Sequence, residues 1–122
     1  MKNQCVTKEI AERLEKLGFD EVSEYNYSEV YGFVENINGL KHSDGNNRFV
    51  SAPLWQEAID WLDEMGVIVE ITKDNLLRNI ENKTFTYTIY TDESEKLFNS
   101  HYKKRATARK HAIEDALAIL EN

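Results

Sequence analysis

The sequence predicts an α+β fold in which helices pack on one face of a small antiparallel sheet. Apolar residues recur at helical spacing in three segments, near the two ends of the chain and in its centre. Threonine alternates with larger apolar residues in TFTYTIYT, Thr84 to Thr91, as in a strand with one buried and one wetted face. Turn-forming residues separate these segments, so the expected order of elements is α-β-loop-α-β-β-β-α.

The first expected helix runs from Thr7 to Leu17. Thr7 is a suitable N-cap, and Ile10, Leu14 and Leu17 form an apolar stripe along one side. Gly18 ends the helix, because glycine adopts the left-handed conformation of a helix C-terminus without strain.

The residues from Asp20 to Glu35 are expected to be extended. Four aromatic residues lie an even number of positions apart and so share one face of a strand: Tyr25, Tyr27, Tyr31 and Phe33. The following segment, Asn36 to Arg48, is rich in Gly, Asn and Asp, which favours a mobile surface loop.

The central segment FVSAPLWQEAIDWLDEMGVIVEI, Phe49 to Ile71, predicts a buried helix followed by a strand. Ser51 and Pro53 suit its opening, since the first turn of a helix tolerates a residue without an N–H. Its apolar face comprises Leu54, Ala58, Trp61, Leu62 and Met65, widened by Trp55 and Ile59. Gly66 ends the helix, and strand-forming residues follow from Val67 to Ile71.

The last third of the chain predicts a hairpin and a helix. The segment from Asn75 to Ile80 suits either one helical turn or a long loop. The strand TFTYTIYT is followed by a turn at Asp92 to Glu95 and a returning strand from Lys96 to Tyr102. An amphipathic helix from Ala106 to Leu120 ends the chain. The predicted core includes Leu14, Leu17, Ala58, Leu62, Val69, Ile71, Phe85, Tyr87, Ile89, Ala112, Ala116 and Leu117.

Length and composition limit the function classes. A chain of 122 residues with 41% hydrophobic residues and no internal repeat or linker predicts one domain over residues 1–122. The single cysteine, Cys5, excludes a disulfide framework and favours a reducing cytoplasm. A formal net charge of −7 argues against broad binding to nucleic acid or anionic membranes. The sequence predicts neither a signal peptide nor a membrane span.

Three pieces in order resemble a family of small uncharacterised accessory proteins from phages and prophages of gut bacteria. They are EIAERLEKLGFDE with its tyrosine-rich sequel, SAPLWQEAIDWLDE with the strand VIVEI, and a tyrosine/threonine strand before a basic segment and an alanine-rich helix. The resemblance covers nearly the whole chain. It implies a protein that acts inside a bacterial host cell, and it implies no catalytic residues.

A cluster of cations at the start of the last helix is a candidate anion-binding or nucleic-acid-binding site. It comprises Lys103, Lys104, Arg105, Arg109 and Lys110, and residues 103–110 contain no acid. Cations at a helix N-terminus oppose the macrodipole, so this order is not the one that favours helix stability. The alternatives are a solvated helix start near acidic residues, contact with phosphate or nucleic acid, and contact with an acidic protein.

The same region is similar to a double-stranded-RNA-binding domain, whose elements run α-β-β-β-α. The segment ARKHAIEDAL, Ala108 to Leu117, resembles the last helix of that domain, with Arg109, Ala112, Ala116 and Leu117 in matching places. The lysine pair expected before it falls on Arg105 and Ala106, and the glycine-rich lead-in and the groove-binding loop have no equivalent.

Aromatic side chains offer a second candidate site. Tyr25, Tyr27, Tyr31 and Trp55 suit a surface that contacts a protein partner, since interfaces are enriched in aromatic anchors, but they suit a core equally well. The acids of the central helix, Glu57, Asp60, Asp63 and Glu64, suit a solvated face.

The sequence contains no pattern typical of a catalytic, metal or cofactor site. His42, His101 and His111 are scattered, and no P-loop, GxGxxG or GxSxG occurs. We therefore expect no enzyme activity and no cofactor. The leading expectation is a protein that binds a host or phage protein in the bacterial cytoplasm, with host takeover or anti-defence as roles. The alternative is a nucleic-acid binder that uses the basic start of the last helix.

Overall fold

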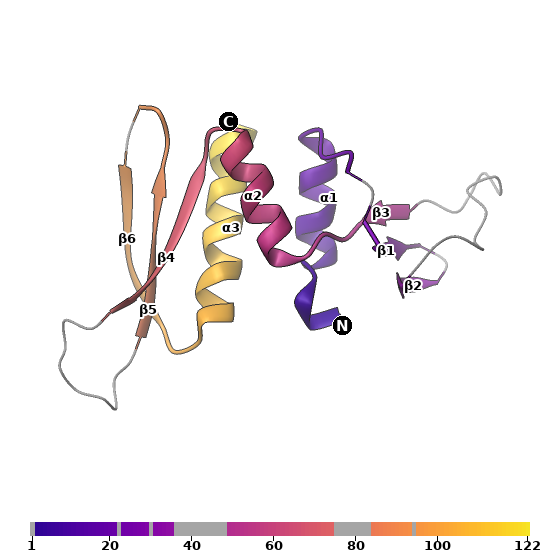
Figure 1. The fold of residues 1–122 in the computed structure, drawn as a ribbon, viewed down its shortest axis with the longest axis horizontal. Helices are drawn as coiled ribbons and strands as arrows, with labels where there is room; N and C mark the ends of the chain where they lie inside the picture. Colours follow the sequence, from indigo (N-terminus) through magenta and orange to yellow (C-terminus); the bar gives the residue numbers. More distant parts are fainter. Residues whose placement is uncertain (1, 22, 30, 36–48, 75–83, 94) are drawn as a thin grey trace. The chain divides into compact units, whose positions relative to one another are not determined.

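The computed structural model of the chain describes residues 2–21, 23–29, 31–35, 49–74, 84–93 and 95–122 (Figure 1). The elements in chain order are a short 3₁₀ turn η1 (Lys2–Gln4), α1 (Lys8–Lys16), β1 (Tyr25–Ser28), β2 (Gly32–Glu35), β3 (Phe49–Ser51), α2 (Trp55–Glu64), β4 (Ile68–Asp74), β5 (Thr84–Tyr90), β6 (Glu95–Tyr102) and α3 (Arg105–Glu121). The loop predicted over 36–48 and the ambiguous segment 75–80 lie outside the described residues.

The predicted α+β class is confirmed. In the described residues the helices accompany two antiparallel sheets of three strands, ordered β2-β1-β3 and β4-β5-β6, where the sequence predicted one small sheet. The contacts divide the chain into two compact units, Met1–Ala58 (unit 1) and Ile59–Asn122 (unit 2). The boundary falls inside α2, and the single domain predicted over residues 1–122 stays a prediction.

The ends of α1 follow the sequence prediction. The backbone N–H of Ile10 donates to Thr7 Oγ1 at 3.3 Å, so Thr7 caps the helix. Gly18 has φ +104°, and its N–H donates to the Glu15 carbonyl at 3.0 Å. The N–H of Phe19 donates to the Leu14 carbonyl at 3.0 Å, which completes a Schellman motif.

The start of α2 differs from the prediction. Ser51 and Pro53 were expected to open the helix, but Phe49–Ser51 forms β3 and α2 begins at Trp55. The residue before a proline is disfavoured from helical backbone, so the helix does not extend back through Ala52, and Phe49–Ser51 pairs with β1 instead. The Leu54 N–H donates to Glu57 Oε1 at 2.7 Å, so a carboxylate three residues along caps the helix from inside.

The C-terminal end of α2 repeats the arrangement seen in α1. Gly66 has φ +91°, its N–H donates to the Asp63 carbonyl at 2.9 Å, and the Val67 N–H donates to the Leu62 carbonyl at 2.9 Å. Leu62 and Val67 are both buried, as expected for the apolar contact that accompanies a Schellman motif. The helix therefore stops where the sequence predicted.

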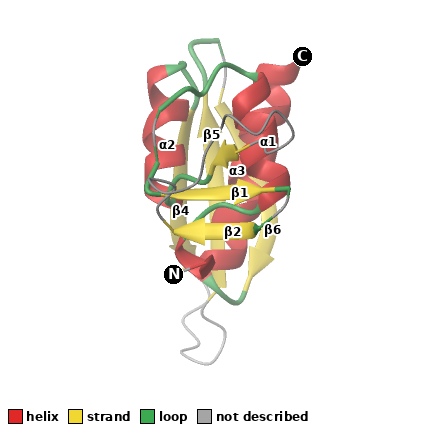
Figure 2. Cartoon of the chain, turned by 90° about the vertical axis from the view of Figure 1, so that its right-hand side faces the viewer, coloured by secondary structure: helices red, strands yellow, loops and turns green. Residues whose placement is uncertain are grey.

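Unit 1 is built around β1, which pairs with β2 on one side and with β3 on the other. Figure 2 looks onto the β1–β2 hairpin, in which Tyr27 lies opposite Phe33. The Tyr27 and Phe33 rings meet edge to face at 5.4 Å, and the Tyr25 ring stacks on Phe33 at 5.8 Å. These ring contacts hold the hairpin together.

The N-terminal segment of unit 1 is fixed by hydrogen bonds to distant parts of the chain. The Val6 N–H donates to the Pro53 carbonyl at 3.0 Å, and the Tyr27 hydroxyl donates to the Val6 carbonyl at 2.7 Å. Trp55 Nε1 donates to the Asn3 carbonyl at 3.0 Å. Two aromatic side chains thus use their polar atoms inside the unit.

In unit 2, α3 packs against one face of the β4-β5-β6 sheet and contacts all three strands (Figure 1). Its buried side is Ala108, Ala112, Ile113, Ala116 and Leu117. The register places Val69 opposite Ile89 and Ile71 opposite Tyr87. Because Tyr87 and Ile89 are buried, this is the face that α3 covers.

Most of the predicted core is buried. Leu14, Ala58, Leu62, Tyr87, Ile89, Ala112, Ala116 and Leu117 are buried, whereas Leu17, Val69, Ile71 and Phe85 are half-buried. The core also contains Ile10, Trp61 and Ile113 from the predicted apolar faces of the helices, and Val6, Phe19 and Val67, which the prediction did not assign to the core.

Candidate nucleic-acid interface

The five predicted cations lie together where β6 passes into α3. Lys103, Lys104, Arg105 and Lys110 are exposed, and Arg109 is half-buried. We call these five residues the basic end of unit 2. Their charges are concentrated because the turn between strand and helix brings residues 103–105 beside the first turns of α3. The structure therefore places all five in one region of unit 2.

The backbone at the basic end leaves donors available. Lys104 occupies the N-cap position with extended backbone, φ −120° and ψ 140°, and no side chain caps the helix there. The first turn of α3 also contains no acidic residue. The first N–H groups of a helix have no partner within the helix and lie at the positive end of its dipole. Together with the cations they form a region that favours an anion.

Two arginines on one side of α3 lie close enough to repel each other. Burial lowers the pKa of Arg109, and the positive charge of Arg105 lowers it further. The Arg105 guanidinium lies 5.2 Å from the centre of the Phe85 ring, an arrangement that positions it without neutralising its charge. A bound anion would relieve this repulsion, because it would add the negative charge that the helix start lacks.

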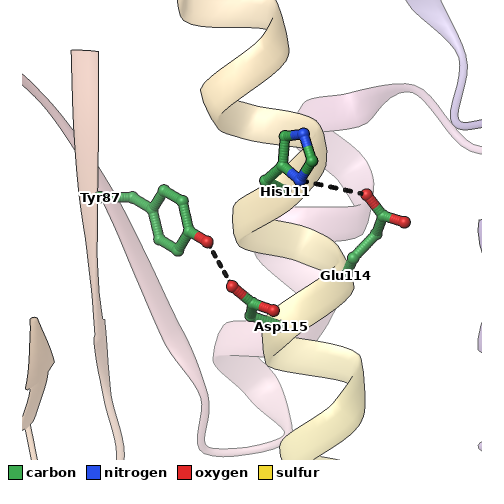
Figure 3. A network of polar contacts seen from close by, with 4 residues as sticks. All are labelled: Tyr87, His111, Glu114 and Asp115. Atoms are coloured by element: carbon green, nitrogen blue, oxygen red, sulfur yellow. Dashed lines mark hydrogen bonds and ion pairs between the residues drawn. The ribbon is translucent and has the colours of Figure 1, made fainter. Parts of the chain in front are cut away.

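An aromatic stack attaches the N-terminal half of α3 to the sheet. The Tyr102 ring stacks on His111 at 4.8 Å and on Tyr87 at 6.2 Å. The Tyr87 hydroxyl donates to Asp115 Oδ2, one helical turn further along α3 than His111 (Figure 3). These contacts join two strands to the helix and hold the basic end in place.

The same contacts determine the protonation of Tyr87. Burial raises its pKa well above the usual value near 10, and the hydrogen bond to the Asp115 carboxylate raises it further. Tyr87 therefore stays protonated at neutral pH and acts as a hydrogen-bond donor. This arrangement serves the attachment of α3 and does not produce a basic or nucleophilic oxygen.

Two histidines flank the basic end. His111 Nδ1 lies 3.9 Å from Glu114 Oε1 (Figure 3). His101 Nδ1 lies 3.3 Å from Thr84 Oγ1. The sequence pattern, in which the histidines are scattered, does not predict the contacts of His111 with Tyr102 and Glu114. The signal that was available is the helical spacing of three or four residues that joins His111 to Glu114 and Asp115.

Acidic residues lie at the opposite end of unit 2. Because β5 and β6 are antiparallel, the turn that carries Asp92, Glu93 and Glu95 is at the far end of the strands from Lys103. The C-terminal end of α3, with Glu121, lies at this end too (Figure 1). With 17 residues, α3 separates the two ends by about 25 Å.

The formal charge of the basic end, that of its five cations, is opposite in sign to the −7 that the whole chain carries. A surface of one sign can therefore act locally within a protein of the other sign.

The aromatic contact surface predicted from four residues is not assembled. Tyr25, Tyr27 and Trp55 are each 7% exposed, and only Tyr31, in the β1–β2 turn, is largely exposed at 56%. Burial supports the core alternative for the three buried residues, and the hydrogen bonds of Tyr27 and Trp55 to backbone carbonyls explain how their polar atoms are accommodated. Tyr31 alone remains a candidate contact residue.

Within the described part of the chain, no group of three or more His, Cys, Asp or Glu side chains is placed to hold a metal ion. None of the helices in these residues combines the length and apolar character needed to cross a membrane. Comparison of the chain with protein-family models, with curated proteins and with solved structures found no match.

Proposed function

We propose that this protein is a non-catalytic binding protein that contacts the phosphate backbone of a nucleic-acid duplex through the basic end of unit 2. The observation that carries the proposal is the separation of charge within unit 2, with five cations at one end and exposed acids at the other. Phosphate contacts depend on local positive charge, so the net charge of −7 does not prevent them.

The arrangement of elements gives a second line of support. The half of α2 that belongs to unit 2 is followed by β4, β5, β6 and α3, which is the α-β-β-β-α order that the sequence resemblance to double-stranded-RNA-binding domains implies. The basic end lies at the start of the last helix in that order. Double-stranded RNA is therefore the first duplex to test, and duplex DNA is the comparison.

Binding to a host or phage protein, the leading expectation from the sequence, is a second candidate. The burial of Tyr25, Tyr27 and Trp55 removes most of its expected aromatic anchors. What favours it is two exposed apolar side chains close together in the sequence of unit 2, Met65 and Ile68. For either candidate we propose a phage-type accessory role without catalysis in the cytoplasm of a bacterial host cell.

The test is a fluorescence-anisotropy titration of labelled duplex RNA and DNA of about 20 base pairs. Wild type is compared with Lys104→Glu/Lys110→Glu, which reverses the charge of two exposed lysines of the basic end. If four exposed cations neutralise four phosphates, the affinity of the wild type falls with a log–log salt slope of about −3.6. The double variant is expected to abolish binding at about 50 mM salt.

The matched control is Lys8→Glu/Lys16→Glu, which reverses two exposed lysines of α1 and changes the net charge equally. Retained binding in this control, together with loss in the basic-end variant, supports the proposal. Equal losses in both variants would show that net charge alone governs binding. Binding through phosphate contacts is tighter at about 50 mM than at physiological salt, so absence of wild-type binding at about 50 mM salt and about 100 μM protein would refute the proposal.

A further inference from the structure

The face of the β4-β5-β6 sheet opposite to α3 carries a row of one aliphatic, one aromatic and one acidic side chain. Ile68 lies opposite Tyr90, and Tyr90 lies opposite Glu95 on the next strand. Residues that are directly opposite in antiparallel strands share a face, and Tyr90 follows Ile89, which is buried on the α3 side. We call this face the outer sheet surface; its described members include Ile68, Glu70, Thr72, Thr86, Thr88, Tyr90 and Glu95.

Two carboxylates flank the ring of Tyr90. Glu70 lies two residues from Ile68 on the same face of β4, which makes it a diagonal neighbour of Tyr90, and Glu95 lies directly opposite Tyr90 on β6. Partial burial raises the pKa of Tyr90, and the negative charges of Glu70 and Glu95 raise it further, which places both carboxylates near the phenol. Glu70 and Glu95 are exposed, and Tyr90 is half-buried.

An apolar side chain completes the surface. Ile68, the first residue of the edge strand β4, is 47% exposed and lies directly opposite Tyr90. Ring, carboxylates and Ile68 together present an apolar strip with negative charge on two sides. This combination differs from a solvated acidic patch, because it offers a place for an aliphatic stem as well as for a charge.

Guanidinium is the group that fits these features best. Its planar face stacks on an aromatic ring, and its N–H groups donate to carboxylates at the edges of that ring. A lysine ammonium pairs with one carboxylate but cannot stack in the same way. We propose that the outer sheet surface binds an arginine-bearing, positively charged segment of another protein, with the arginine side chain seated on Tyr90 between Glu70 and Glu95 and its neighbour against Ile68.

Charge complementarity identifies the partner as a cationic protein segment. Asp92 and Glu93, in the turn that follows Tyr90, extend the negative field beyond the surface itself. A nucleic acid would be repelled here, whereas a basic segment is attracted. The inference uses none of the residues of the basic end and does not depend on the proposed function.

The test titrates the isotopically labelled full chain with two capped peptides of alternating sequence, one of arginine and leucine and one of lysine and leucine. Binding is followed by backbone amide shifts at about 150 mM salt, where the Debye length is about 8 Å and distant charges contribute little. The arginine peptide is expected to bind about tenfold more tightly than the lysine peptide, and its largest shifts should fall on β4 and β5.

Glu70→Gln/Glu95→Gln is expected to weaken binding of the arginine peptide about tenfold. Tyr90→Thr, which keeps a strand-forming residue, should remove the preference for arginine over lysine. The matched control, Asp20→Asn/Glu29→Gln, removes two exposed carboxylates of unit 1 and should change the affinity by less than about twofold.

Three results would overturn the proposal. The first is equal affinity for the two peptides, and the second is an equal loss of affinity in the control and in Glu70→Gln/Glu95→Gln. The third is self-association of the wild type in sedimentation experiments that Glu70→Gln/Glu95→Gln abolishes, because the surface would then join two copies of this chain.

Discussion

Replacing Tyr87 by phenylalanine isolates the hydrogen bond that joins β5 to α3. Tyr87 is 3% exposed, and its hydroxyl donates to the half-buried carboxylate of Asp115. The phenylalanine ring fills the same space, so the change removes one hydrogen bond to a charged group and creates no large cavity. Such bonds contribute about 1.5–3 kcal/mol. Because Asp115 keeps contact with solvent, the lower part of this range is expected at about pH 8.

The contribution of Tyr87 depends on pH in a defined direction. In the folded protein its pKa is raised mainly by burial and further by the hydrogen bond to Asp115. In the unfolded chain the pKa of this tyrosine is about 10. The unfolded chain therefore loses the tyrosine proton before the folded protein does. Stability is fully present below about pH 10 and is lost as the pH rises above that value. At about pH 11 the loss amounts to about 1.4 kcal/mol.

The assay is urea denaturation of wild type and Tyr87→Phe at several values between about pH 8 and pH 11. Tyr25, Tyr27 and Tyr90 also have raised pKa values, but they are present in both proteins and cancel in the difference. The advantage of the wild type should shrink by about 1.4 kcal/mol across this range. Parallel curves for the two proteins would show that Tyr87 is not held protonated by its surroundings, and the reasoning would fail.

Two further predictions concern the fold. Leu62→Ala should lower the free energy of unfolding by about 2–5 kcal/mol, because Leu62 is fully buried. Met65→Ala, at a side chain that is 46% exposed, should change it by less than about 0.5 kcal/mol. Equal melting temperatures for the two variants would contradict the packing of α2. Gly66→Ala should cost about 1–2 kcal/mol in chemical denaturation, since φ is +91° and no atom lies within 4 Å of an added Cβ, and an unchanged midpoint would contradict the left-handed conformation.

The sequence predicted local structure correctly where a single residue type determines it, as at helix ends and in an alternating strand. Gly18 and Gly66 end their helices in the left-handed conformation, and Thr7 caps α1. The alternation of TFTYTIYT correctly placed Tyr87 and Ile89 on the buried face of β5. In each case the cause lies within a few residues of the effect, so no knowledge of distant contacts is needed.

Distant contacts decided the features that the sequence did not predict. The partition of strands into two sheets depends on which edges pair, and β3 exists because Asn26 to Ser28 offers it a partner. The even spacing of tyrosines in β1 predicted a shared face but not its burial. The buried Tyr27 hydroxyl donates to the Val6 carbonyl, 21 positions away in the chain. Aromatic residues that suit a core and an interface equally well are therefore separated only by the fold.

The distribution of charge over the candidate sites is likewise decided by the fold and not by the sequence alone. A sum of −7 describes the chain as a whole, but the antiparallel turn between β5 and β6 places Asp92, Glu93 and Glu95 at one end of unit 2 and the run from Lys103 to Lys110 at the other. In the sequence these groups are separated by fewer than ten residues, so a sliding window averages them toward neutrality. In space about 25 Å lies between them, several times the distance over which salt screens a charge at about 0.15 M. The two proposed ligands, an anion at one end and a cationic segment at the other, would therefore be bound by different residues of unit 2 and would not compete.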